Sequence, residues 1–162
     1  MFQKLVLLTL LCSIFFSLQC KQQGIIKIGI IHSTTGHMAI SETPLVNVYK
    51  MAIEEINSNG GIHGKKVVAF IRDGKSDPNI FATEVENLIT NENISFIFAC
   101  WTSACRKKVK PIVEKHNKIM FYPLQYEGME SSPNIIYTGA APNQQIIPAI
   151  NWLMKQEKNK FF

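Results

Sequence analysis

Two cysteines that stand five positions apart are the residues of this sequence most suggestive of chemistry. The stretch FACWTSACRKK, residues 98–108, places them around a tryptophan and two hydroxyl residues, and three basic residues follow. Such a composition could serve a metal or redox site, a basic patch for an acidic partner, or a plain turn. Cys100 and Cys105 have neither a CxxC spacing nor a second ligand pair nearby, so zinc is disfavoured and we expect no metal or cofactor.

The same stretch is typical of a junction between a strand and a helix. A strand that ends near Cys100 and a helix that begins near Ser103 would make Thr102 or Ser103 the helix N-cap. The free N–H groups and the positive dipole at such a helix end can meet a carbonyl or carboxylate oxygen of a small ligand. Trp101 would add an apolar wall with one N–H donor. The residues alone equally allow that Ser103 only caps the helix and Trp101 only packs.

The cysteines and the basic residues also have plainer interpretations. Cys100 and Cys105 could approach each other across the turn, and export would permit a disulfide, but the sequence does not fix their geometry. The basic side chains stand in the first turns of the expected helix, where the dipole disfavours cations, so we expect them on a solvated outer face. They are Arg106, Lys107, Lys108 and Lys110. The rest of the +5 formal charge is spread along the chain, and we expect no nucleic-acid partner.

Motifs for nucleotide binding and hydrolysis are missing from the sequence. The segment HSTTGH lacks the GxGxxG spacing, and no GxxxxGK[ST], GxSxG or HExxH occurs. The four histidines lie in separate segments, so Ser103 has no evident base beside it. We therefore expect that the protein is not an enzyme.

The elements that must position these residues alternate between strand and helix. Apolar, β-branched runs predict strands over residues 25–31, 65–73, 94–100, 118–123 and 134–139. Helical spacing predicts helices over residues 41–61, 78–89, 103–117 and 142–156, the second of them with an N-cap at Ser76 or Asp77 and Pro78 in its first position. In the first helix the expected inward face is Leu45, Val48, Ala52 and Ile56. Residues 160–162 resemble the start of a further strand.

This alternation predicts an α/β fold, a doubly wound three-layer sandwich around a mostly parallel sheet. The 162 residues, 46% of them hydrophobic, suffice to bury a core. Ligands of such sheets meet the loops at the carboxyl ends of the strands, here HSTTG, RDGKSD, CWTSA and YPLQYEG. Tyr122 and Tyr126 together with Trp101 would make a neutral pocket rim, which suits a small, uncharged polar solute.

The N-terminus predicts export. Residues 1–20 have one early lysine, a short apolar run and a polar break, which is the pattern of a secretory signal peptide. The segment resembles a bacterial lipoprotein signal, in which Cys20 becomes the acylated first residue and residues 21–25 form a tether. The alternative is a plain signal peptide with an unmodified Cys20.

Several blocks together resemble one known family. IGIIHSTTGHMAISE, AIEEINSNGGIHGKKV, FACWTSACRKKVKPIVEKHN and FYPLQYEGMESSPNIIYTGAAPNQQIIPAINWL are similar to the urea and short-chain amide binding proteins of ABC transporters, in the type I periplasmic binding protein superfamily. The resemblance runs from Ile26 to Phe162. It implies two α/β lobes that clamp a urea or amide and deliver it to a membrane permease. It implies as ligand-facing residues Trp101, Ser103, Tyr122, Leu124 and Gln125.

The resemblance also sets expectations for the extent and location of the protein. Residues 26–162 would be the N-terminal lobe, because relatives continue for roughly one more domain. We therefore expect a truncated binding component of reduced or no activity, which is periplasmic or anchored to the membrane by a lipid at Cys20. Its partners would be a small-molecule ligand, the ABC permease and the membrane. The alternative is an amide-sensing regulatory protein of the same fold, against which the segment Met1–Cys20 argues.

Overall fold

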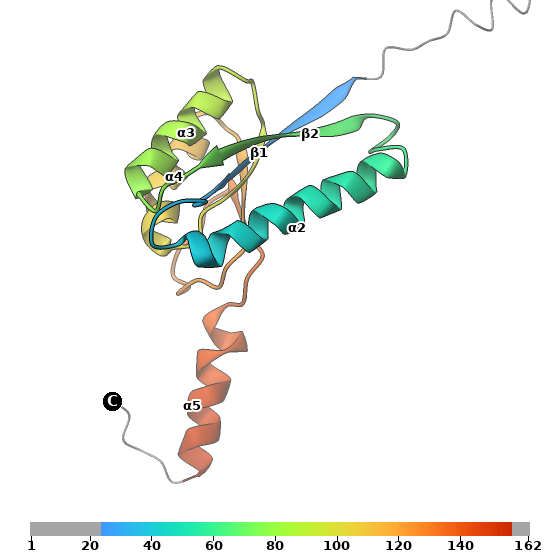
Figure 1. Cartoon of the computed structure of the whole chain (residues 1–162). Coiled ribbons are helices and arrows are strands. Elements are labelled where there is room, and N and C mark those ends of the chain that lie inside the picture. Colours follow the sequence, from blue (N-terminus) through green and yellow to red (C-terminus); the bar gives the residue numbers. More distant parts are fainter. Residues whose placement is uncertain (1–23, 157–162) are drawn as a thin grey trace, which may run out of the picture.

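The computed structural model describes residues 24–156, which contain one parallel sheet of five strands (Figure 1). The strands are β1 (Ile25–His32), β2 (Lys66–Asp73), β3 (Phe96–Ala99), β4 (Ile119–Tyr122) and β5 (Ile135–Tyr137). They pair in the order β2-β1-β3-β4-β5, and all four pairings are parallel. The predicted α/β fold with a parallel sheet is confirmed, and each strand begins and ends within two residues of its predicted bounds.

Helices cover both faces of this sheet. They are α2 (Ala39–Ser58), α3 (Pro78–Thr90), α4 (Ser103–Lys115) and α5 (Ile146–Lys155), with a short 3₁₀ helix η1 (Pro142–Gln144) before the last. Helices α3 and α4 pack together on one face, and α2 lies on the other (Figure 1). The core between the sheet and α3 and α4 includes Val85, Leu88, Ile97, Val109 and Met120, all fully buried.

Local signals start α3 and α4 where the sequence predicts, whereas α2 begins two residues before and α5 four residues after its predicted start. The Asp77 side chain accepts a hydrogen bond from the N–H of Asn79, and Pro78 occupies the first helical position of α3. Thr102 caps α4 in the same way, because its hydroxyl oxygen accepts from the N–H of Cys105 at 3.2 Å. The first turn of α4 therefore stands directly after the end of β3.

Helix α2 buries a different face from the predicted one. Val48 is 53% exposed and Ile56 36% exposed, whereas Glu42 and Val46 are buried. Apolar residues thus lie on two faces of the helix. The buried face, which carries Val46, begins with the acidic residue Glu42 rather than with a hydrophobic residue. Because His32 and the N–H of Ser33 give the Glu42 carboxylate polar partners, the charged side chain can face inward.

Helix α5 extends away from the sheet and packs on η1 (Figure 1). Most of its large apolar side chains are exposed, and Pro148 lies in its first turn. The predicted signal peptide, Cys20 and the expected strand at residues 160–162 lie outside the described residues. Across residues 24–156, no helix has both the length and the apolar character that a membrane crossing requires.

Candidate functional site

Three loops at the carboxyl edge of the sheet surround a pocket of about 240 Å³. They follow β1, β2 and β3, and the pocket lies where the strand order reverses between β1 and β3. At such a switch point the two chain connections leave toward opposite faces of the sheet, which opens a crevice. The lining residues are His37, Met38, Glu42, Ser76, Pro78, Phe81, Thr102, Ala104 and Cys105.

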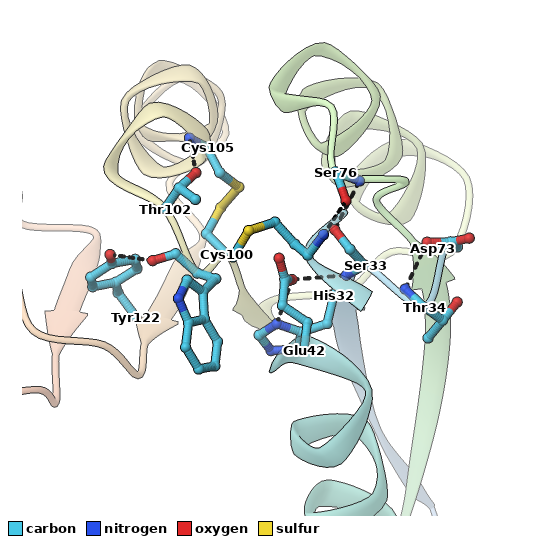
Figure 2. A network of polar contacts seen from close by, with 12 residues as sticks. His32, Ser33, Thr34, Glu42, Asp73, Ser76, Cys100, Thr102, Cys105 and Tyr122 are labelled. Atoms are coloured by element: carbon cyan, nitrogen blue, oxygen red, sulfur yellow. Dashed lines mark hydrogen bonds and ion pairs between the residues drawn. A yellow bond between two sulfur atoms is a disulfide. The ribbon is translucent and has the colours of Figure 1, made fainter. Parts of the chain in front are cut away.

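A disulfide shapes the wall that follows β3. Cys100 and Cys105 are bonded to each other, with Cα atoms 5.6 Å apart, and both side chains are buried. Cys100 has a φ of 72°, a left-handed conformation that turns the chain sharply out of the strand. The disulfide, which the sequence leaves open, therefore ties the end of β3 to the first turn of α4 (Figure 2).

Removal of this disulfide should lower the free energy of unfolding by about 2 kcal/mol, the value that the chain-entropy model gives for so short a loop. The test is guanidinium unfolding of a double Cys100→Ala, Cys105→Ala variant, with Cys12 and Cys20 replaced by serine in every protein compared. Dithiothreitol should bring the parent to the stability of the variant and leave the variant unchanged. Equal stability of parent and variant without reductant would contradict the prediction.

A buried acid and a buried histidine meet below the pocket (Figure 2). The Oε2 atom of Glu42 lies 3.2 Å from Nδ1 of His32 and accepts a hydrogen bond of 2.8 Å from the N–H of Ser33. His32 is fully buried and stacks on the Tyr49 ring, with the ring centroids 5.6 Å apart. These contacts fix the side chain that forms the acidic part of the pocket lining.

Asp73 joins the loops that follow β1 and β2. Its Oδ1 atom accepts from the N–H groups of Thr34 and Lys75, both at 2.9 Å, and the Thr35 hydroxyl donates to its Oδ2 atom at 2.6 Å. Although partial burial acts to raise the pKa of Asp73, the hydrogen bonds from Thr35, Lys75 and Thr34 outweigh it and lower the pKa to about 2. Asp73 is thus ionised at neutral pH and holds two walls of the pocket together.

Arg106 is buried, which makes the prediction of a solvated outer position wrong for this residue. Its side chain is 1% exposed, and its Nε and Nη2 atoms donate to Glu130 and Glu127, each at 3.0 Å. Lys107 and Lys108 on the same helix are exposed, as expected. The difference arises because the loop after β4 passes over α4 and supplies two carboxylates to one of the four basic side chains.

Three tyrosine rings complete the surroundings of this guanidinium. The Arg106 Cζ atom lies 4.7 Å from the ring centroid of Tyr122, and the rings of Tyr126 and Tyr137 are within 6 Å. We call Arg106, Glu127, Glu130 and these three tyrosines the Arg106 cluster. The pKa of Glu127 is lowered to about 2 by hydrogen bonds that its carboxylate accepts from the Ser103 hydroxyl, from the backbone N–H of Glu127 itself and from Arg106. The cluster is therefore charged at neutral pH and fixes the loop after β4 against α4.

The chain matches the family model of the periplasmic binding protein domain over residues 26–162. It belongs to this family. The Leu/Ile/Val-binding protein BraC3 of Rhizobium johnstonii is 28% identical over 141 residues, which cover 83% of this chain and 37% of BraC3. The leucine-specific-binding protein of Salmonella typhimurium is 31% identical over 98 residues, or 60% of this chain and 26% of that protein. The chain thus spans at most little more than a third of the length of these curated relatives.

Solved structures show the same architecture. The branched-chain amino acid transporter substrate binding protein LivJ of Streptococcus pneumoniae, in complex with isoleucine, is 28% identical with a TM-score of 0.60 over 61% of this chain and 28% of that one. The fatty acid ABC transporter substrate-binding protein of Thermomonospora curvata is 23% identical with a TM-score of 0.68 over 84% and 36% of the two chains, and it shows the fold alone. The predicted resemblance is confirmed for periplasmic binding proteins, whereas urea or amide specificity stays a prediction.

In this member of the family, the predicted ligand residues gather at the same sheet edge but differ in their surroundings. The Tyr122 hydroxyl donates to the Trp101 carbonyl at 2.7 Å, which brings these two together. Ser103 donates its hydroxyl to Glu127. Two hydroxyl groups that the resemblance assigns to a ligand thus have partners within the protein, and Tyr122 is only 1% exposed.

The other two predicted residues lie beside β5. A side chain at Gly139 would overlap the backbone of Leu124 and Gln125, so this loop and the segment after β5 pack backbone to backbone. Leu124 is half-buried against the core and Gln125 is exposed. The ligand-binding role of the five predicted residues remains a prediction.

Sequence reasoning missed Glu42 and its partner His32, which are close to the pocket. The available signal was spacing, because Glu42 stands four positions before Val46 on one helical face. Across residues 24–156, no three acidic, histidine or cysteine side chains form a group that could hold a metal ion. The pair therefore has to be interpreted through hydrogen bonding.

Proposed function

We propose that this chain is the ligand-holding lobe of a solute-binding component of an ABC transporter, and that its ligand is urea or a short-chain amide. Membership of the periplasmic binding protein domain family supports the binding role. The sequence blocks CWTSA, YPLQYEG and GAAPNQQ support the ligand class. Export through residues 1–20, a lipid anchor at Cys20 and delivery to a membrane permease belong to the same proposal. A binder of this kind needs no activated nucleophile, and we propose no enzymatic activity.

The observation that carries the proposal is the exposed start of α4 at the pocket. The N–H groups of Ser103 and Ala104 have no partner within the described chain, and Ala104 lines the pocket. Donors at the positive end of a helix suit the carbonyl oxygen of a small polar solute. Met38, Pro78 and Phe81 form apolar walls of the same pocket, which suit a short alkyl group.

Branched-chain amino acids are the second candidate ligand. They are favoured by the printed names of the relatives, which include Leu/Ile/Val-binding and leucine-specific-binding proteins. Such a ligand would need a donor set for its carboxylate, an acceptor for its ammonium group and room for its side chain.

Saturation-transfer difference NMR on the full chain distinguishes the two ligand classes. We expect saturation of the acetamide methyl signal, a decrease of that signal when urea is added, and no transfer to the methyl groups of leucine. Transfer to leucine alone would favour the second candidate. No transfer to either solute would overturn the proposed function.

A further inference from the structure

We propose that Glu42 accepts a hydrogen bond from the NH₂ group of the ligand and thereby selects solutes with a free planar NH₂, namely primary amides and urea. The inference rests on the proposed function, because it names the group that recognises the nitrogen end of the same ligand. It concerns a residue outside the five that the resemblance assigns.

The two carboxylate oxygens of Glu42 are unequally satisfied. The residue is 1% exposed, and its Oε2 atom has both the Ser33 N–H and the His32 ring as partners. Its Oε1 atom has no hydrogen-bond partner among residues 24–156, although the residue lines the pocket. Oε1 is not among the fully buried polar atoms of the described residues that lack a partner, so it stays accessible from the pocket. A donor on a ligand in the pocket would therefore meet a free acceptor.

His32 holds the acid in this orientation. The Nε2 atom of His32 is buried and has no partner within the described chain. The tautomer with its proton on Nδ1 therefore gives Glu42 a donor and leaves only an acceptor of the ring unpaired. Stacking on Tyr49 fixes the ring plane. Figure 2 shows the consequence, because the second oxygen of Glu42 points away from His32, toward the loops that carry Ser76 and the Cys100–Cys105 disulfide.

The charges of the pocket favour a hydrogen-bond donor of the ligand beside Glu42. Among the described residues that line it, Glu42 is the only acid, His37 is the other ionisable side chain, and there is no lysine or arginine. Arg106 is held by Glu127 and Glu130 in the Arg106 cluster. A ligand carboxylate placed beside Glu42 would thus meet a negative charge without a paired cation, which is unfavourable in a desolvated site. An N–H group of the ligand meets an acceptor there instead, and a neutral amide NH₂ does so without a charge of its own.

The two polar walls match the two ends of an amide group. The start of α4 offers N–H donors for the carbonyl oxygen, and Glu42 offers an acceptor for the NH₂ group. Urea presents the same carbonyl and a second NH₂ group. A solute whose nitrogen is fully methylated presents the carbonyl but no donor, so it should lose the contact with Glu42.

The test is a ¹H–¹⁵N correlation titration of the full chain with acetamide, urea, N,N-dimethylacetamide and ammonium chloride at millimolar concentrations. We expect acetamide and urea to shift the amide signals of Ser76 and Ala104, with apparent dissociation constants about tenfold higher for Glu42→Gln, because a charged acceptor binds more strongly than a neutral one. Glu54→Gln, an exposed acid of the same helix, is the matched control and should leave the constants unchanged. N,N-dimethylacetamide should shift none of these signals.

The possible results separate this inference from the proposed function. Equal affinity of the parent and Glu42→Gln for acetamide overturns the role of Glu42 and leaves the proposed function standing. Binding of ammonium chloride with the same signal changes overturns the amide selectivity. If no solute shifts any signal, the proposed function fails and the inference fails with it. If Glu42→Gln does not fold, as the spectrum itself would show, the comparison of acetamide with its dimethyl derivative on the parent decides.

Discussion

Replacement of Arg106 with alanine should lower the free energy of unfolding by about 3 kcal/mol, the lower end of the range for removal of one partner from a buried ion pair. The side chain of Glu130 is only 14% exposed and would lose its charged donor, keeping the Tyr137 hydroxyl as the donor to its Oε1 atom. Glu127 is 65% exposed, so water can replace most of what it loses. The Tyr122 ring would also lose the guanidinium that covers it.

Guanidinium unfolding of Arg106→Ala and of the parent measures this difference. Lys107→Ala is the matched control, because Lys107 is exposed on the same helix and its replacement should change the free energy by less than about 0.5 kcal/mol. Arg106→Lys should fall between them, since an ammonium cannot donate to both glutamates with the geometry of a guanidinium. A loss no larger than that of Lys107→Ala would contradict the assignment of Arg106 as a buried partner.

The strands and the starts of α3 and α4 could be predicted because their signals are local. A β-branched run is enough to predict β1, and Asp77 followed by Pro78 predicts the start of α3. Short connections between strands and helices predict a doubly wound parallel sheet, whereas the strand order β2-β1-β3-β4-β5 comes from the structure. The carboxyl edge of the sheet, and with it the loops of the pocket, could therefore be located from sequence.

The buried polar residues could not be predicted, because their partners are distant in the chain. Arg106 is inside only because Glu127 and Glu130 return to it from the loop after β4. Glu42 is inside because β1 presents His32 and the Ser33 N–H to the start of α2. A pattern of apolar spacing assigns such charged side chains to the surface, and for Glu42 this also led to the wrong face of the helix.

The candidate site shows the same division between local and distant causes. The sequence predicts Thr102 or Ser103 as the N-cap of α4, and Thr102 is the cap. It does not reveal that the Ser103 and Tyr122 hydroxyls have partners in the protein. The disulfide could not be predicted, because a spacing of five residues does not determine the left-handed conformation that Cys100 adopts beside it.

Replacement of Glu42 with leucine should lower the free energy of unfolding by about 3 kcal/mol. Two buried donors lose their acceptor, which costs about 1–3 kcal/mol for each donor, and burial of the apolar leucine side chain offsets part of that cost. The donors are the Ser33 N–H and the Nδ1 atom of His32. The measurement is guanidinium unfolding, with Glu54→Leu as the control on the exposed face of α2.

A double variant and an isosteric variant separate holding the fold from binding a ligand. The double variant His32→Phe, Glu42→Leu should regain the part of the lost unfolding free energy that is due to the unpaired histidine. The remaining loss, about 1–2 kcal/mol, should be due to the unpaired N–H of Ser33. Glu42→Gln keeps an acceptor for Ser33 and should stay within about 1 kcal/mol of the parent. If Glu42→Leu is as stable as the parent, Glu42 does not accept these hydrogen bonds. If Glu42→Gln is stable, the fold needs an acceptor at this position but not a negative charge, which leaves ligand recognition as a reason for the acid.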